Sequence, residues 1–174
     1  MMIRWTGVFA AFVLLLLSLS ACGQSAREDD FYTFKKVESK EYIRVGTTRN
    51  ELYAVASRNP LDYGIWPQYQ EQGDDMAVLS LHNRGFFYQT MNGLSLNNHL
   101  EDVIPAYAND PEARVIVEED TMIVLEKIIG GVRYTATFVS YKDHTLKAIT
   151  LTNRDECGRV LVDYSGVYDG IYSE

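Results

Sequence analysis

The chain has 174 residues, of which 47% are hydrophobic, and its 16 Lys and Arg face 24 Asp and Glu, for a formal net charge of −8. A chain of this length buries a core of ordinary size, so that neither a metal ion nor a disulfide is required for stability. The acidic balance argues against nucleic acid and anionic lipid surfaces as partners, because both repel it.

Residues 1–21 have the pattern of a bacterial signal peptide. Arg4 precedes an apolar run from Gly7 to Leu19, which is shorter than the ~20 residues that a membrane-spanning helix needs. The alternative, an uncleaved transmembrane helix, would have to continue past Cys22 to Arg27, and lipid rejects such a charge. We therefore expect this segment to be removed from the mature protein.

The segment Leu19-Ser20-Ala21-Cys22 resembles the lipobox of bacterial lipoproteins, in which the cysteine is acylated and becomes the mature N-terminus. The resemblance implies that Cys22 anchors the protein to the extracytoplasmic face of a bacterial membrane, or to the outer membrane where the host has one. Residues 22–30 then form the anchor and a flexible tether, and residues 31–174 form one domain. An acylated Cys22 leaves Cys157 without an intrachain disulfide partner, so that a free or capped thiol and pairing with another protein are the alternatives.

The first predicted unit spans about 42–92. Thr48 and Glu51 have the spacing of a capping box, which predicts a short amphipathic helix that ends at Asn59-Pro60. Beyond this helix we expect a loop to residue 75, a buried strand at 76–81 and the second strand of a hairpin at 86–90.

The second predicted unit spans about 93–153. Asn98 and Glu101 can supply the cap of another helix, which Pro105 kinks or keeps very short. The remaining sequence predicts an antiparallel meander of four strands, at Ala113–Val117, Thr121–Lys127, Val132–Val139 and Leu146–Thr152.

The strand at Val132–Val139 alternates between apolar and polar residues. Tyr134 and Phe138 fall on one face, whereas Thr135 and Thr137 fall on the other, which is typical of a sheet with one wet side. We therefore expect an α+β fold, with short helices packed on one face of an antiparallel sheet. The tail at 154–174 is expected to be an irregular strand or a frayed end, with tyrosines at 164, 168 and 172.

Two stretches resemble a known lipoprotein family. The stretch Ile43-Arg-Val-Gly-Thr-Thr-Arg-Asn-Glu-Leu-Tyr-Ala-Val-Ala-Ser-Arg-Asn-Pro60 is similar to the opening of the small-protein-A-like lipoproteins. These include the small lipoprotein of the β-barrel assembly machinery, and the β-lactamase inhibitory proteins carry two such units. The stretch from Gly93 to Tyr107 looks like a sequence motif of similar tandem lipoproteins from Gram-positive bacteria. The resemblance implies tandem helix-plus-strands units and a protein partner in the envelope.

The sequence offers little that is typical of a metal or catalytic site. The three histidines, His82, His99 and His144, each lie more than four residues from another histidine or cysteine, so that we expect surface or capping roles and no metal site. The acidic runs lack the alternating oxygen ligands of a calcium loop. We therefore expect no cofactor.

Aromatic residues are the best indication of function. Tyr63, Trp66 and Tyr69 fall in a predicted loop, and Phe87 falls on the strand face opposite Phe86 and Tyr88. Exposed rings of this kind are typical binding anchors, whereas for the Phe residues the alternative is a place in the core. We expect a non-catalytic protein-binding or scaffold module of the cell envelope.

Two alternative functions remain open at this point. One is a lipoprotein that senses a small ligand or a metal ion. The other is a hydrolase of the cell wall that uses a carboxylate pair such as Glu118 and Glu126.

Overall fold

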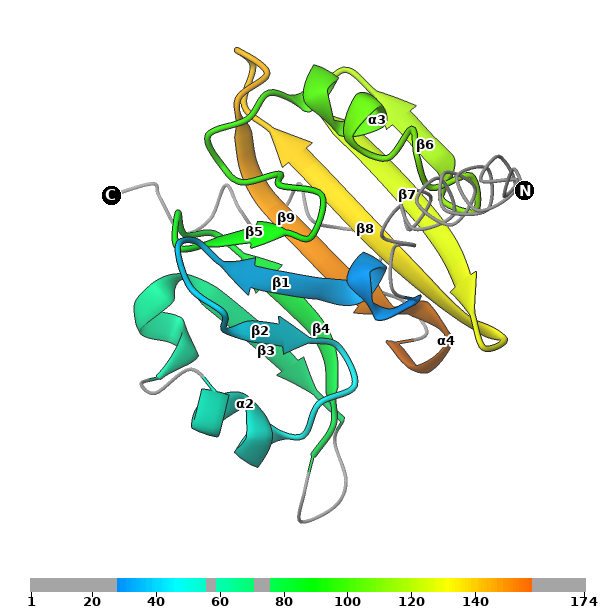
Figure 1. Ribbon diagram of the computed structural model, residues 1–174. Helices are drawn as coiled ribbons and strands as arrows, with labels where there is room; N and C mark the ends of the chain where they lie inside the picture. Colours follow the sequence, from blue (N-terminus) through cyan, green and yellow to red (C-terminus); the bar gives the residue numbers. More distant parts are fainter. Residues whose placement is uncertain (1–27, 56–58, 71–75, 158–174) are drawn as a thin grey trace, which may run out of the picture.

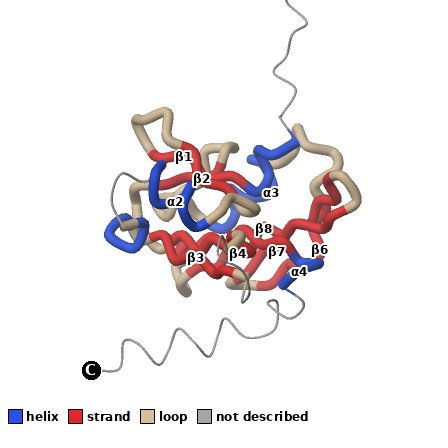
Figure 2. Tube along the Cα trace, turned by 90° about the horizontal axis from the view of Figure 1, so that it is seen from below, coloured by secondary structure: helices blue, strands red, loops and turns tan. Residues whose placement is uncertain are grey.

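The computed structural model describes residues 28–55, 59–70 and 76–157. In this part of the chain, nine strands form two antiparallel sheets (Figure 1), one of six strands in the order β3-β4-β9-β8-β7-β6 and one of three in the order β2-β1-β5. The sheets lie face to face as two layers (Figure 2). The strands are β1 (Thr33–Lys36), β2 (Tyr42–Arg44), β3 (Ile65–Tyr69), β4 (Val78–Asn83), β5 (Tyr88–Thr90), β6 (Arg114–Glu119), β7 (Met122–Ile129), β8 (Val132–Ser140) and β9 (Leu146–Asn153).

The helices of the described chain are short. The α-helices are α2 (Arg49–Val55), α3 (Val103–Ala106) and α4 (Arg154–Cys157), and the 3-10 turns are η1 (Glu28–Tyr32), η2 (Pro60–Tyr63) and η3 (Leu100–Asp102). None of the described helices is long and apolar enough to span a membrane.

The predicted fold class, short helices packed on one face of an antiparallel sheet, is wrong. The three-stranded sheet, and not a layer of helices, covers the apolar face of the six-stranded sheet (Figure 2). The helix α2 buries only Leu52 and α3 only Val103, so that neither contributes a broad apolar stripe. The structure is therefore mostly β, and the helices lie at its edges.

The hydrophobic core fills the space between the two sheets. Phe34, Ile43 and Tyr88 enter it from the three-stranded sheet and are 0–1% exposed. The six-stranded sheet supplies Leu81, Leu125, Ala136, Phe138, Ile149 and Leu151, among others. Alternate residues of its strands therefore face the other layer, as the pleat of a strand requires.

The predicted meander is confirmed, and the predicted hairpin is wrong. The strands β6 to β9 pair in sequence order. The strand β4 pairs with β3 and β9, whereas β5 pairs with β1 in the other sheet. The connection between β4 and β5 therefore crosses from one layer to the other. The three residues of β5 belong to the three-stranded sheet, where they pair with β1, which is far away in the sequence.

The predicted loop between 61 and 75 contains the strand β3. Pro67 lies inside this strand, where proline normally removes a hydrogen bond of the ladder. Because β3 lies at the edge of the sheet and pairs with β4 alone, the missing N–H group costs little there. The proline that favoured a loop in the sequence is therefore accommodated in an edge strand.

The first predicted helix cap is confirmed and the second is wrong. The Thr48 backbone N–H donates to the Glu51 carboxylate over 2.9 Å, and the Glu51 N–H donates to the Thr48 hydroxyl over 3.2 Å. In the second unit the Asp102 carboxylate instead accepts from the His99 N–H, over 2.9 Å. The side chain of Asn98 accepts from the Ser95 N–H. The helix α3 has four residues, which confirms that Pro105 keeps it very short.

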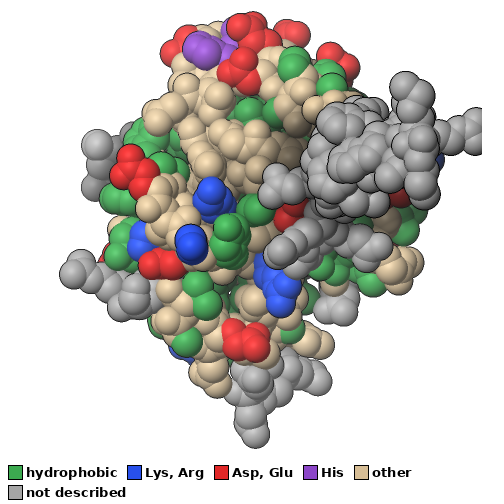
Figure 3. Space-filling model, in the orientation of Figure 1, with side chains coloured by type: hydrophobic (Ala, Val, Ile, Leu, Met, Phe, Trp, Pro, Cys, Tyr) green, Lys and Arg blue, Asp and Glu red, His purple; other side chains and the backbone are tan. Residues whose placement is uncertain are grey.

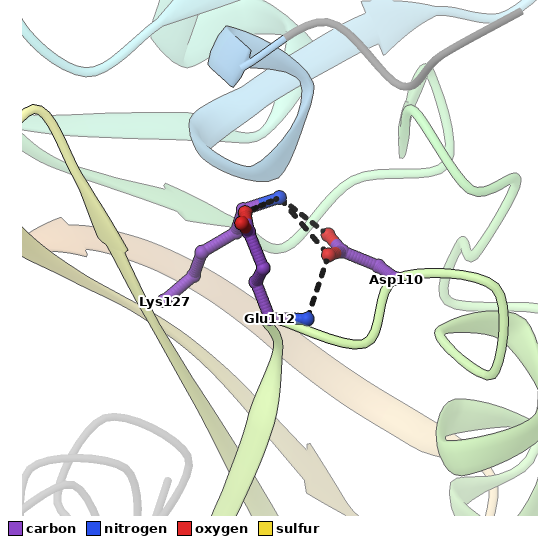
Figure 4. A network of polar contacts seen from close by, with 3 residues as sticks. All are labelled: Asp110, Glu112 and Lys127. Atoms are coloured by element: carbon purple, nitrogen blue, oxygen red, sulfur yellow. Dashed lines mark hydrogen bonds and ion pairs between the residues drawn. The ribbon is translucent and has the colours of Figure 1, made fainter.

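A buried ion pair joins the meander to the loop after α3 (Figure 4). The Lys127 ammonium donates to both carboxylate oxygens of Asp110, over 3.0 and 2.8 Å. A third group, the Glu112 carboxylate, lies 3.5 Å from the same nitrogen, but its side chain is 73% exposed. Lys127 faces the interior between the layers, so that Asp110 is the group that keeps its charge paired.

Candidate functional site

Of the four residues predicted to bind a partner, the structure brings two together and separates the other two from them. Tyr63 ends η2, Trp66 and Tyr69 belong to β3, and Phe87 lies between β4 and β5. Trp66 is 51% exposed, whereas its neighbour Ile65 is in the core, so that Trp66 faces away from the three-stranded sheet. Tyr69 is partly buried against the core, near the Arg49 guanidinium. Tyr63 and Phe87 are the pair that come together.

We call the surface around this pair the aromatic surface and define it as Val37, Tyr63, Phe86 and Phe87. Tyr63 is partly buried against the core, and the other three are exposed. The rings of Tyr63 and Phe87 meet edge to face, with centroids 5.3 Å apart. The Val37 N–H donates to the Phe87 carbonyl over 2.8 Å, which attaches the end of β1 to the cluster. Phe86 is 62% exposed and Phe87 53%.

Two glycines allow the cluster to form. A Cβ on Gly64 would lie 2.6 Å from the backbone of Gly85, and a Cβ on Gly85 would clash with the Tyr63 carbonyl. The Arg84 N–H also donates to the Gly64 carbonyl, over 2.8 Å. The backbone at the end of η2 therefore lies directly against the turn that carries Phe86 and Phe87, which a side chain at either glycine would prevent.

Asn83 fixes the shape of this turn. Its buried side chain donates to the Tyr88 carbonyl over 2.8 Å and accepts from the Gly85 N–H over 3.1 Å. Asn is a favoured residue at such sites because its amide imitates a turn of the backbone. The backbone of the turn is therefore held by buried hydrogen bonds of Asn83.

A charged pair, Lys36 and Glu41, lies beside the aromatic surface. The Lys36 ammonium lies 4.6 Å from the centre of the Tyr63 ring and is paired with the Glu41 carboxylate at 2.8 Å. On the face seen in Figure 3, Lys and Arg lie over the three-stranded sheet, whereas Asp and Glu gather over α3 and the β8–β9 turn. On this face of the molecule the charge is therefore unevenly distributed.

The residues considered for chemistry do not converge. Glu126 pairs with Thr135 on one side of the sheet, and Glu118 pairs with the core residue Ile123, so that the two carboxylates lie on opposite faces. Glu126 instead forms an ion pair with Arg154 at 3.2 Å. Among the described residues, no three of the His, Cys, Asp and Glu side chains lie close enough to hold a metal ion.

His82 is the histidine with a clearly altered environment. It lies in β4, its Nδ1 is 3.0 Å from the Thr150 hydroxyl, and burial together with Arg84 lowers the pKa of its ring to about 4. His82 is therefore neutral at neutral pH. His99 precedes η3 and His144 lies in the β8–β9 turn, as the sequence predicted.

Several predicted features lie outside the described residues, among them the signal peptide, Cys22 and the tyrosines at 164, 168 and 172. The helix α4 ends at Cys157, but the position of the thiol is not described. Comparison with protein-family models, with curated proteins and with solved structures gives no match. The function is therefore inferred from the sequence and the geometry of the chain alone.

Proposed function

We propose that the protein is a lipid-anchored, extracytoplasmic module that binds an envelope protein through the aromatic surface. The observation that supports this most strongly is the exposure of two consecutive Phe residues on a turn whose backbone is held by Asn83. Turns normally carry Gly, Asn, Asp, Ser or Pro, and contiguous exposed apolar residues are a common mark of interaction sites. The Phe87 ring packs on Tyr63, but more than half of Phe86 and of Phe87 stays exposed, and binding gives a reason for that exposure.

The size of the rings is sufficient for a binding anchor. A Phe side chain buries roughly 150–250 Å² in an interface, and at about 25 cal/mol per Å² the exposed half of each ring is worth on the order of 2 kcal/mol. Because Asn83 and the two glycines already fix the turn, little ordering entropy opposes binding. The partner should therefore present an apolar groove that accepts two rings.

The binding proposal is tested with a double variant and a matched control. The variant Phe86→Ser, Phe87→Ser removes both rings, and Tyr141→Ser removes a ring that is 59% exposed on the β8–β9 turn. Each is used as bait with envelope extract. We expect a stoichiometric partner to be retained by Tyr141→Ser and weakened by roughly 30-fold or more in the double variant. Equal retention by both baits would rule out the aromatic surface.

The anchoring proposal has a separate test. If Cys22 is acylated, Cys22→Ser moves the protein from the membrane fraction to the soluble extracytoplasmic fraction, because the acyl chains supply the membrane affinity. A variant that stays with the membrane would contradict this role of Cys22. The result is independent of the bait experiment, so that anchoring and partner binding can fail separately.

A further inference from the structure

The strand β6 is an edge strand whose apolar side chains stay exposed. It ends the six-stranded sheet, at one end of the layer in Figure 2, and among the described strands it pairs with β7 alone. Its sequence, Arg-Val-Ile-Val-Glu-Glu, has three consecutive β-branched apolar residues, yet none of its six residues belongs to the core between the sheets. Val115 is 41% exposed and Ile116 39%. Exposed apolar residues on an edge strand are typical of a site that pairs with a further strand.

The other edges of the two sheets are less open to an added strand. The opposite edge of the six-stranded sheet, β3, carries Pro67, and the edges of the three-stranded sheet, β2 and β5, have three residues each. Proline, lysine, short length and bulges are the usual protections of an edge. Of these, β6 has only a bulge, between Val115 and Val117. We therefore consider β6 the edge that is best suited to strand addition.

The turn after β6 determines which of its backbone groups point outward. Glu119 and Met122 flank a two-residue turn and are paired, and such a closing pair exchanges backbone hydrogen bonds. Alternation along the strand then directs the N–H and C=O groups of Glu118 away from β7. Arg114 pairs with β7 four residues beyond Met122, so that it also bonds inward and Val115 points outward. The strand thus presents two donors and two acceptors at the edge of the sheet.

We propose that β6 pairs with β6 of a second copy of the chain, in antiparallel direction about a two-fold axis. Val115 and Glu118, whose backbone groups point outward, then exchange hydrogen bonds with Glu118 and Val115 of the second copy. In this register Arg114 lies opposite Glu119 of the second copy, and the symmetry repeats the pair at the other end. This inference goes beyond the proposed function and does not depend on it.

The charges of β6 are complementary to those of a second β6. Arg114 and Glu119 are both exposed. Their partners on β7, Glu126 and Met122, are four residues apart and therefore lie on one face of the sheet. Arg114 and Glu119 share this face although they are five residues apart in the sequence, because the bulge adds one residue to β6. The bulge therefore allows two opposite charges to lie directly across the strand pair, where such charges are stabilising.

The same register brings the apolar residues together and keeps the carboxylates apart. Ile116 and Val117 of the two copies meet at the two-fold axis, and Glu118 lies opposite Val115 of the second copy. No carboxylate of β6 lies opposite another one, which would be destabilising. A shift of the register in either direction removes both ion pairs. The sequence of β6 is therefore self-complementary when it is read in antiparallel direction, which favours a second copy over an unrelated strand.

Disulfide capture between two full chains tests the register. One chain carries Arg114→Cys and the other Glu119→Cys, each with Cys157→Ser and a different tag, and both are produced in the same cells. We expect a mild oxidant to give a linked pair with both tags, because directly opposite residues lie within the ~7 Å between Cα atoms that a disulfide tolerates. Two chains with Arg114→Cys place their thiols roughly 13 Å apart, and we expect at least about tenfold less product. Equal yields, or no linked pair, would overturn the proposal.

Charge reversal tests the ion pairs. The photoreactive residue p-benzoylphenylalanine at Ile116 of the full chain reports association in cells as a cross-linked homodimer. Arg114→Glu and Glu119→Arg each place like charges opposite one another at both ends, and we expect each to lower the homodimer yield by about fivefold or more. The double variant restores opposite charges and should return most of the yield, although it carries both local changes.

Two results of the charge reversal would count against the second copy. One is a double variant with no more homodimer than the single variants, and the other is a different protein linked to position 116 in place of the homodimer. If a single variant does not fold, the disulfide capture still decides.

Discussion

Replacing Gly85 by alanine tests the backbone contact that builds the aromatic surface. The new Cβ would clash with the Tyr63 carbonyl and would also lie 3.1 Å from Gly64. Because the obstacle is backbone and cannot rotate away, the two segments must separate. Overpacking of this kind costs typically about 1–3 kcal/mol, and a backbone obstacle places the cost at the upper part of this range. We expect Gly85→Ala to lower the free energy of unfolding by about 2–3 kcal/mol.

Gly93→Ala separates this contact from simple backbone strain. Gly93 has φ +86°, and a Cβ added there would meet no atom within 4 Å, so that only the left-handed conformation is penalised, by about 1–2 kcal/mol. Urea unfolding followed by circular dichroism measures both variants. A loss of about 2 kcal/mol corresponds to a fall in Tm of roughly 4–8 °C. A loss below about 0.5 kcal/mol in Gly85→Ala would refute the contact, since overpacking against backbone costs more than this.

Three further predictions concern the remaining polar groups. Asp110→Asn should lower the free energy of unfolding by about 3 kcal/mol, because it leaves the Lys127 ammonium buried without its carboxylate partner. Glu112→Gln, at the exposed partner, should lower it by less than about 1 kcal/mol. Similar losses in the two variants, measured by chemical unfolding, would contradict this. The pKa of His82 falls from 6.5 to about 4 on folding, so that only the unfolded chain binds its proton between these values. The free energy of unfolding should therefore fall as the pH falls from 6.5 to about 4, by up to about 3 kcal/mol. His82→Gln should show a shallower fall. Identical pH profiles of the two proteins would exclude His82 as the cause. Thr48→Ala should cost about 1 kcal/mol by breaking the capping box of α2, and an unchanged melting temperature would exclude that role.

The parts of the fold that the sequence predicted correctly are those with local signals. Long alternating runs made the strands of the meander recognisable, and Thr48 with Glu51 marked the start of α2. The three-stranded sheet has strands of three or four residues, which are too short to show a period. Its partners β1 and β5 are also more than 50 residues apart, and such pairing leaves no local signal.

The candidate site could be predicted only in part. The aromatic content around residues 63–69 was noted correctly, but alternation within an unrecognised edge strand places Trp66 on the side of the sheet away from the three-stranded sheet. Phe87 was predicted to be an exposed ring on one face of a strand. It is exposed, but it lies in a turn. The pairing of Tyr63 with Phe87 depends on the close approach of Gly64 and Gly85, which no spacing in the sequence indicates.

The central claim is that the aromatic surface contacts a protein partner in the cell envelope. The most direct test places p-benzoylphenylalanine at Phe87 or at Tyr141 of the full chain and irradiates living cells. Both positions are more than half exposed, so that random encounters should label them equally. The account predicts one discrete cross-linked protein from position 87 and none from position 141. The same products from both positions, or none from position 87, would contradict it.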